Sequence, residues 1–343
     1  MSEGTRRPRE RNPGRQTRLT RAVFVAAVLV PSVLVVLALW FQLDDLGRWP
    51  AILATALISV WLVRLAASGP THAGWAFLVV FIACASLWWD SIQPSQHRGW
   101  APDVAHGVTA RIEGSTAIVH DVRNFDWRSE DDFTERWETR EFDLEALSSV
   151  DLVNSTWGNP AIAHTLVSFG FEDGDHVTFS AEIRRERHEK FSELGGFFKK
   201  FELVMIAAAE SDIVRLRTNA RREDVSLYPL ALTPAQGRTL FLTYLHKGNE
   251  LAARPQFYNT ITANCTTIVF QLARLVEPRI PMDWRILVSG YLPDYLYELG
   301  VIRTELPLED AKRQARISRL AQEADPDAEY SSVIRSGGAH SGR

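Results

Sequence analysis

Three side chains have the types and the predicted settings that thiol chemistry requires, and the first of them is Cys265. It stands where a polar, turn-prone stretch gives way to a helical pattern running from Thr266 to Val276. A cysteine there is expected to be the first residue of a helix, where free N–H groups and the helix dipole stabilise the nucleophilic thiolate. A lone cysteine is more often a small buried apolar residue. The thiol therefore needs a base nearby to act as a nucleophile.

The second and third side chains come from a predicted β-hairpin. Two runs that alternate between apolar and polar residues flank the loop 172–174. With that three-residue loop, Val167 lies opposite Phe179, and the same register places His164 opposite Glu182. A carboxylate beside a histidine fixes its tautomer and supports it as a general base. Three other histidines are alternative candidates for the base: His176, His188 and His246.

This combination has a known use. Cysteine proteases and related acyl-transfer enzymes need a thiol at a helix N-terminus, a histidine from a neighbouring strand and a third group that orients it. Here the histidine precedes the cysteine, the reverse of the papain-like order, which suits a circularly permuted arrangement. We expect neither a cofactor nor a metal ion. The polar residues near the cysteine are candidates for substrate binding: Tyr258, Asn259, Asn264 and Thr266.

The N-terminal part of the chain predicts a membrane anchor. Residues 1–21 carry seven arginines and two glutamates, a net charge of +5, and are expected to be a disordered cytoplasmic tail. Three apolar runs follow within residues 22–93, and the first is long enough to cross a hydrocarbon core of about 30 Å. Three runs in succession favour a stable anchor over a cleavable signal peptide. Because the basic tail stays inside, three crossings deliver the chain beyond Asp90 to the extracytoplasmic side.

The exported part reads as a mixed α+β domain. Residues 22–93 carry −1, so the total charge of −4 leaves −8 for residues 94–343, a balance that does not favour nucleic acid as a partner. Cys84 belongs to the third apolar run, which leaves Cys265 without a partner for an internal disulfide. We expect a linker at 94–115, a folded domain at 116–324 and a disordered tail at 325–343. Within the domain, 202–209 and 212–218 read as strands, and Thr233 followed by Pro234 begins a helix.

Several separated motifs, in order, resemble the Lnb N-terminal periplasmic domain family. They are RNFDW at 123–127, AHTLVSF at 163–169, AEIR at 181–184, FEL at 201–203, LRT at 216–218, YPL at 228–230, FYNT at 257–260 and NCTT at 264–267. The resemblance covers roughly residues 120 to 280. It implies a papain-like, NlpC-related thiol fold in the bacterial periplasm, with an antiparallel sheet packed on helices, the nucleophile at Cys265 and the base at His164. The assignment of Glu182 as the orienting group rests on the hairpin register.

The family's namesake is a lipoprotein N-acyltransferase, which moves an acyl chain from phospholipid to the N-terminal amine of a lipoprotein. The resemblance thus implies a thiol acyltransferase or hydrolase in the inner membrane, with phospholipid or lipoprotein as substrate. Two alternatives stay open: a cysteine peptidase or amidase that acts on cell-wall peptides, and a non-catalytic module that binds peptide or lipid. This chain departs from the namesake in its three N-terminal spans, and the resemblance does not cover the chain after about residue 280. A shared fold does not fix the substrate.

Overall fold

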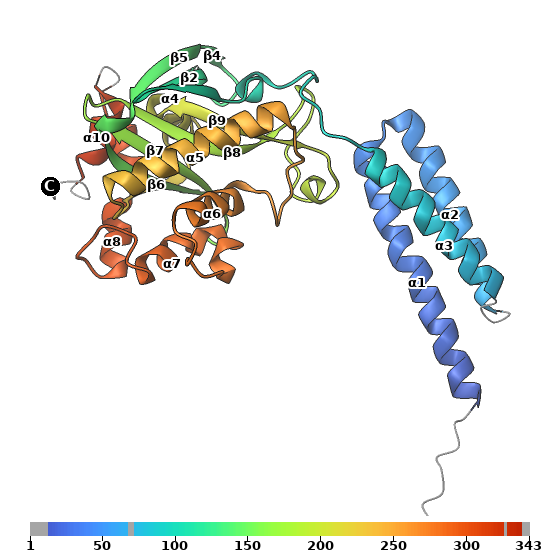
Figure 1. The fold of residues 1–343 in the computed structure, drawn as a ribbon. Coiled ribbons are helices and arrows are strands. Elements are labelled where there is room, and N and C mark those ends of the chain that lie inside the picture. Colours follow the sequence, from blue (N-terminus) through green and yellow to red (C-terminus); the bar gives the residue numbers. More distant parts are fainter. Residues whose placement is uncertain (1–12, 68–71, 326–327, 338–343) are drawn as a thin grey trace, which may run out of the picture. The chain divides into compact units, whose positions relative to one another are not determined.

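The structure is a computed structural model that describes residues 13–67, 72–325 and 328–337 (Figure 1). The chain divides into two compact units, which are described separately. The first comprises Met1–Gln93 together with Phe198–Lys200, and the second comprises Pro94–Phe197 and Phe201–Arg343. The architecture is mixed α+β, with three apolar N-terminal helices and a sheet packed on helices, as the sequence predicts.

The first unit is built from three helices, α1 (Pro13–Gln42), α2 (Asp45–Ala67) and α3 (His72–Ser91). All three are long and apolar enough to cross a membrane. The expected basic tail lies partly outside the described residues, at 1–12. Its remainder is helical from Pro13 onward rather than disordered, because it continues the first turns of an apolar helix with proline at the favoured first position.

Polar contacts join these helices where apolar packing alone would not fix their register. Ser59 Oγ on α2 donates a hydrogen bond to Ser32 Oγ on α1 over 2.7 Å, next to Pro31 inside α1. Residues Phe198–Lys200 belong to the same unit. The Phe198 ring stacks on Phe41 with centroids 5.5 Å apart, and Lys199 Nζ donates to the carbonyl oxygen of Trp89 over 2.7 Å.

The second unit is organised by an eight-stranded sheet in the order β1-β2-β9-β8-β7-β6-β10, with β5 pairing to β2. Strand β2 runs parallel to β9, and the other pairs are antiparallel. A separate two-stranded ribbon joins β3 and β4. The strands are β1 (Thr109–Glu113), β2 (Thr116–Arg123), β3 (Asp126–Trp127), β4 (Phe133–Thr134), β5 (Trp137–Asp143), β6 (Leu147–Thr156), β7 (Ala163–Phe171), β8 (His176–Arg184), β9 (Glu202–Ala209) and β10 (Asp224–Pro229).

Helices pack on this sheet and close its ends. They are α4 (Glu210–Arg215), which continues into a π-helical turn (Leu216–Ala220), then α5 (Pro234–Ala253), α6 (Cys265–Val276), α7 (Leu292–Glu298), α8 (Leu308–Ala315), α9 (Ser318–Glu323) and α10 (Tyr330–Arg335). The helix predicted at Thr233 is confirmed. Thr233 caps α5 through a reciprocal pair of hydrogen bonds with Gln236, and Pro234 is its first residue.

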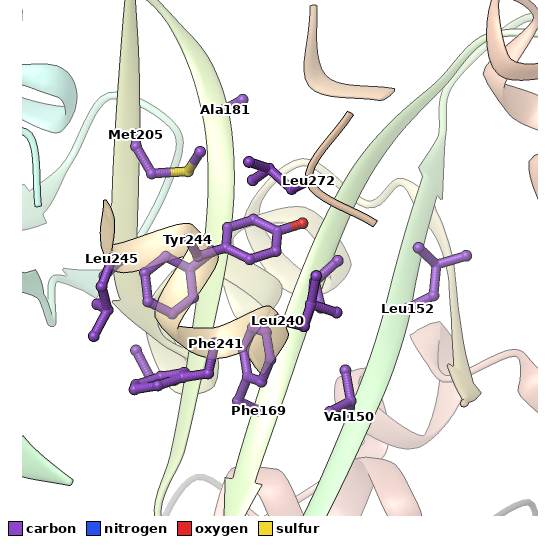
Figure 2. Packing of buried hydrophobic residues seen from close by; sticks show 14 of the residues in the cluster. Val150, Leu152, Phe169, Ala181, Met205, Leu240, Phe241, Tyr244, Leu245 and Leu272 are labelled. Atoms are coloured by element: carbon purple, nitrogen blue, oxygen red, sulfur yellow. The ribbon is translucent and has the colours of Figure 1, made fainter. Parts of the chain in front are cut away.

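Aromatic side chains form the centre of the core between α5 and the sheet (Figure 2). Phe241 and Tyr244 of α5 meet Phe169 of β7 and Phe179 of β8, with ring centroids between 5.2 and 5.7 Å apart. These four side chains are almost completely buried. Their edge-to-face packing fixes β7 and β8 against α5, and β7 and β8 carry the residues of the candidate site.

The hairpin register is confirmed. Strands β7 and β8 pair with Val167 opposite Phe179, as the three-residue loop predicts. The apolar partners of this register face α5, so a shift of one residue would turn them to the other side of the sheet. The register of the hairpin is therefore set by burial.

Two segments expected to lack structure are folded. Within 94–115, β1 pairs with β2, and the buried Trp100 forms a bridge with Glu186. Within 325–343, α10 places Arg335 between two buried carboxylates, with Nη2 2.8 Å from Asp151 and Nη1 2.7 Å from Glu210. Isolated apolar and charged residues make these tertiary contacts without producing a periodic pattern. Residues 326–327 and 338–343 lie outside the described residues.

The strand expected at 212–218 is wrong: these residues are helical, and Asp212 forms a buried ion pair there. Its two oxygens accept from Arg123 Nε and Nη2, each over 2.9 Å. They also accept from the Phe125 N–H and from Trp127 Nε1, over 2.8 and 2.7 Å. Asp212 is fully buried, so this cluster joins β2 and the β3–β4 ribbon to α4.

We expect Asp212→Ala to lower the free energy of unfolding by about 3–5 kcal/mol, because it leaves the Arg123 guanidinium buried without its counter-charge. The change is measured by denaturant unfolding of the purified full chain. Asp132→Ala is the control: Asp132 pairs with Arg128 on the surface and its loss should change stability little. Equal effects of the two substitutions would contradict the role given to Asp212.

Candidate active site

Cys265 is the first residue of α6, as the sequence predicts. Asn264 caps this helix: its side-chain oxygen accepts from the Thr267 N–H over 2.8 Å, and Thr267 Oγ1 accepts from the Asn264 N–H over 2.8 Å. The cap leaves the first N–H groups of α6 free to stabilise negative charge at the sulfur. Cys265 is half-buried, so its thiol combines a stabilised anion with access from outside.

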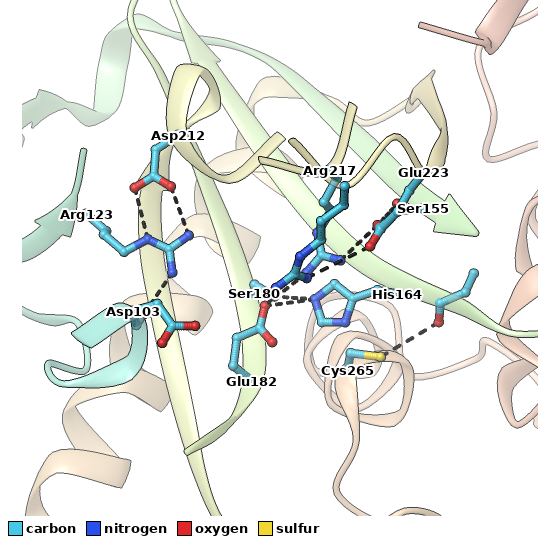
Figure 3. A network of polar contacts seen from close by, with 12 residues as sticks. Asp103, Arg123, Ser155, His164, Ser180, Glu182, Asp212, Arg217, Glu223 and Cys265 are labelled. Atoms are coloured by element: carbon cyan, nitrogen blue, oxygen red, sulfur yellow. Dashed lines mark hydrogen bonds and ion pairs between the residues drawn. The ribbon is translucent and has the colours of Figure 1, made fainter. Parts of the chain in front are cut away.

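His164 and Glu182 meet across the hairpin, as the register predicts (Figure 3). His164 Nε2 lies 3.0 Å from Glu182 Oε1 and 2.6 Å from Ser180 Oγ. Ser180 Oγ in turn donates to the same Glu182 oxygen over 2.8 Å. The charge of His164 also acts on the Cys265 thiol and lowers its pKa. The three predicted residues are thus brought together, and Ser180 joins them.

A second network behind Glu182 was not predicted from the sequence. Arg217, on the π-helical turn, lies 3.3 Å from Glu182 Oε1 through Nη2 and 3.2 Å from Glu223 Oε2 through Nη1. Ser155 Oγ donates to the same Glu223 oxygen over 2.5 Å. Arg217 is almost completely buried. This network fixes the Glu182 carboxylate, which contacts His164. Single π-helical turns are frequently found at functional sites.

The electrostatics of the pair favour thiolate and imidazolium. Burial alone would raise the pKa of the Cys265 thiol, but the charge and hydrogen bond of His164, with bonds from the Thr165 N–H and Thr266 Oγ1, lower it to about 7. Burial and the Arg217 cation would lower the pKa of His164. The charges of Glu182 and Cys265 outweigh both and raise the pKa to about 9. Between these two pKa values both groups are charged.

Glu182 stays ionised over the whole working range. Its burial would raise the pKa, but the charge and hydrogen bond of His164, the charge of Arg217 and the bond from Ser180 hold that pKa far below its usual range. The charged Glu182 attracts the imidazolium form of His164. The carboxylate can therefore orient His164 without taking up a proton itself.

The predicted substrate-binding residues divide into two groups. Asn259 and Asn264 have structural contacts: Asn259 Oδ1 accepts from the N–H groups of Ile261 and Thr262, and Asn264 caps α6. Thr266 is buried beside the sulfur, with Oγ1 3.7 Å from Cys265 Sγ. Burial, followed by the charge of Cys265, raises the pKa of Tyr258. Of the four residues, Tyr258 and Thr266 are thus the two that interact with the thiol, Tyr258 through the charge of Cys265 and Thr266 through a direct contact.

The alternative histidines lie in other settings. Nδ1 of His176 contacts the carbonyl oxygen of Gly174 in the hairpin turn over 2.9 Å. His188 and His246 are exposed to solvent. Among residues 13–67, 72–325 and 328–337, no three His, Cys, Asp or Glu side chains gather as a metal site would require.

An apolar cavity of about 210 Å³ lies along α6 in the second unit. Thr266 is part of its wall and also contacts Cys265. Other wall residues come from α5, α6 and α7, among them Leu240, Tyr244, Val269, Ala273, Tyr295 and Leu296. This cavity therefore favours a hydrocarbon group over a polar one.

We expect alkylation of Cys265 by iodoacetamide to reach half its maximal rate near pH 7, because a lowered thiol pKa keeps the thiolate down to that pH and loses it as the pH falls further. His164→Gln should move the midpoint upward, toward the value of about 8.5 for an ordinary thiol. Both are measured in a Cys84→Ala chain by mass spectrometry over a pH series. A midpoint that is the same with and without His164 would rule out the ion pair.

Comparisons with known proteins agree with the sequence motifs. The family model of the Lnb N-terminal periplasmic domain matches residues 133–290, a segment that contains Cys265, His164, Ser180, Glu182 and Arg217. The search of curated proteins and the search of solved structures found no match. The family is periplasmic, and three helices of this chain are able to span a membrane. Residues 133–290 are therefore similar to the Lnb N-terminal periplasmic domain, the family that the motifs resemble, and the three helices that precede them fit a membrane-associated protein.

Proposed function

We propose that this protein is a cysteine-dependent acyltransferase or hydrolase, anchored in the bacterial inner membrane by α1–α3 with its second unit in the periplasm. The observation that carries the proposal is the contact set at Cys265. A thiol at a helix N-terminus has its pKa lowered by a nearby histidine, and that histidine lies 3.0 Å from a carboxylate oxygen of Glu182. This is the arrangement that nucleophilic thiol catalysis requires.

The proposed reaction has two halves. The Cys265 thiolate attacks the carbonyl carbon of an ester, and the resulting oxyanion is stabilised by the Cys265 N–H and a neighbouring amide. When the tetrahedral intermediate collapses, the carbon–oxygen bond breaks and the His164 imidazolium gives its proton to the leaving alkoxide. The acyl group is then a thioester on Cys265. In the second half an amine or water attacks the thioester while His164 takes the proton, and the thiolate leaves.

The cavity supports an acyl group as the part that is transferred. Its wall is formed largely by aliphatic and aromatic side chains, and it includes Thr266, the residue that follows the proposed nucleophile. An alkyl chain in this cavity would bring its carbonyl group toward the sulfur. We therefore propose phospholipid as the acyl donor and a lipoprotein amine as the acceptor. Hydrolysis is the outcome when water replaces the amine.

We expect the purified full chain, supplied with phospholipid and an acceptor lipopeptide, to form an acyl adduct on Cys265 and N-acylated product. Cys265→Ala should abolish both, and His164→Ala should slow the reaction by about 10²–10⁴-fold, because general base and acid catalysis is lost. Adduct and product are measured by mass spectrometry. Cys84→Ala is the control and should retain activity, because Cys84 lies on α3.

Three results would overturn this proposal. Product formed by Cys265→Ala would exclude the thiol as nucleophile. Cleavage of muropeptides with no reaction on lipids would favour the peptidase or amidase. Binding of lipid or peptide without any turnover, together with cellular function that survives Cys265→Ala, would identify a non-catalytic binding module.

We expect Ala273→Phe to reduce the reaction with long acyl donors more than with short ones, because the added ring fills the cavity that α6 lines. The measurement is the ratio of adduct formation rates for hexadecanoyl and butanoyl esters. Thr243→Phe on the outer side of α5 is the control, since Thr243 does not line the cavity. An unchanged ratio in Ala273→Phe would show that the acyl chain binds elsewhere.

A further inference from the structure

Exposed apolar side chains gather on two segments of the second unit that border Cys265. One segment is the loop between β8 and β9, where Phe191, Leu194 and Phe197 are 56%, 62% and 40% exposed. The other is the turn region before α7, where Trp284 and Leu287 are 60% and 52% exposed. We call these five side chains the apolar rim. Single exposed apolar residues are ordinary, but a gathering of large ones marks an interaction surface.

Short chains of contacts connect both segments to the site. In the loop, the Glu193 carbonyl accepts from Thr260 Oγ1 over 2.8 Å. The Thr260 carbonyl in turn accepts from the side-chain amide of Asn264 over 2.7 Å, and Asn264 caps the helix that begins with Cys265.

On the other side, the link runs through Ser289, two residues after Leu287. Ser289 Oγ donates to the Ala163 carbonyl oxygen over 2.7 Å. The same oxygen lies 4.0 Å from Cys265 Sγ. Both segments that carry the apolar rim are therefore connected to the site of Cys265.

The loop also leads directly into the membrane anchor. The residue after Phe197 is Phe198, whose ring stacks on Phe41 at the end of α1. The next residue is Lys199, whose Nζ donates a hydrogen bond to the carbonyl oxygen of Trp89 at the end of α3. The same Nζ lies over the Trp89 ring, 4.7 Å from the ring centroid. Tryptophan and lysine at the ends of apolar helices mark the membrane–water interface. Adjacent Cα atoms are about 3.8 Å apart. The backbone of Phe197 therefore lies within that distance of Phe198, which contacts the end of α1.

We propose that the apolar rim is a membrane-contacting surface, with its side chains inserted among the lipids at the extracytoplasmic face of the bilayer that holds α1–α3. Phenylalanine, leucine and tryptophan side chains are the types that enter the boundary between head groups and acyl chains. Lipid then borders both sides of Cys265, and a substrate that resides in the bilayer reaches the sulfur without crossing water. The proposal does not depend on the reactivity of the thiol.

The test uses the full chain in vesicles of phosphatidylcholine with an alkyne-tagged phosphatidylcholine tracer. Photoreactive benzoylphenylalanine replaces Phe191 in one protein and Leu287 in another. Ile112 is the matched control position: it is 46% exposed, and it lies on β1, with β2, β9 and β8 between that strand and β7. We expect tracer attached to the two rim positions at several times the yield at position 112.

Equal yields at the three positions, or attachment of the rim probes to another protein chain with none to lipid, would overturn the proposal. The same measurement in a Cys265→Ala background separates it from the proposed reaction. Tracer yield at the rim should be unchanged there while acyl transfer is lost. A yield at the rim that falls with Cys265→Ala would mean that the label reports the acyl adduct rather than lipid contact, and would count against the apolar rim.

Discussion

The contact between His164 and Glu182 is the interaction on which the candidate site depends. Burial alone lowers the pKa of His164 and favours the neutral imidazole, and the nearby Arg217 cation lowers that pKa further. The Glu182 carboxylate reverses this balance, and the imidazolium then lowers the pKa of the Cys265 thiol. The carboxylate thus acts on the pKa of the thiol indirectly, through the intervening imidazole ring.

That carboxylate is held by the fold at several levels. The aromatic core of Phe169, Phe179 and Phe241 sets the register of β7 and β8, and this register brings residues 164 and 182 together. Arg217 then fixes Glu182 from behind, at the end of a helix whose own place depends on the Asp212–Arg123 pair. Core packing, a buried ion pair and the site are therefore linked by contacts between residues, and these contacts determine the position of His164.

Features with a local cause could be predicted from the sequence. Alternation along the hairpin was sufficient for its register, because one face had to be buried. The start of α5 followed from Thr233 and Pro234, and the place of Cys265 followed from the change from polar to periodic residues. By contrast, Arg217 and Ser180 join the site through tertiary contacts that leave no periodic signal. The segment 212–218 reads as a strand in the sequence, yet it is helical, because tertiary contacts can override local preference; Asp212 forms a buried ion pair there.

The contact of Arg335 with Asp151 and Glu210 has a consequence for the order of folding. Asp151 in β6 and Glu210 at the start of α4 are buried, and the guanidinium that balances both comes from the last described helix of the chain. Two buried carboxylates without that cation are costly. The sheet therefore cannot reach its native charge balance until residue 335 has left the ribosome and, in an exported domain, crossed the membrane. Final closure of this fold therefore waits for the segment that carries Arg335.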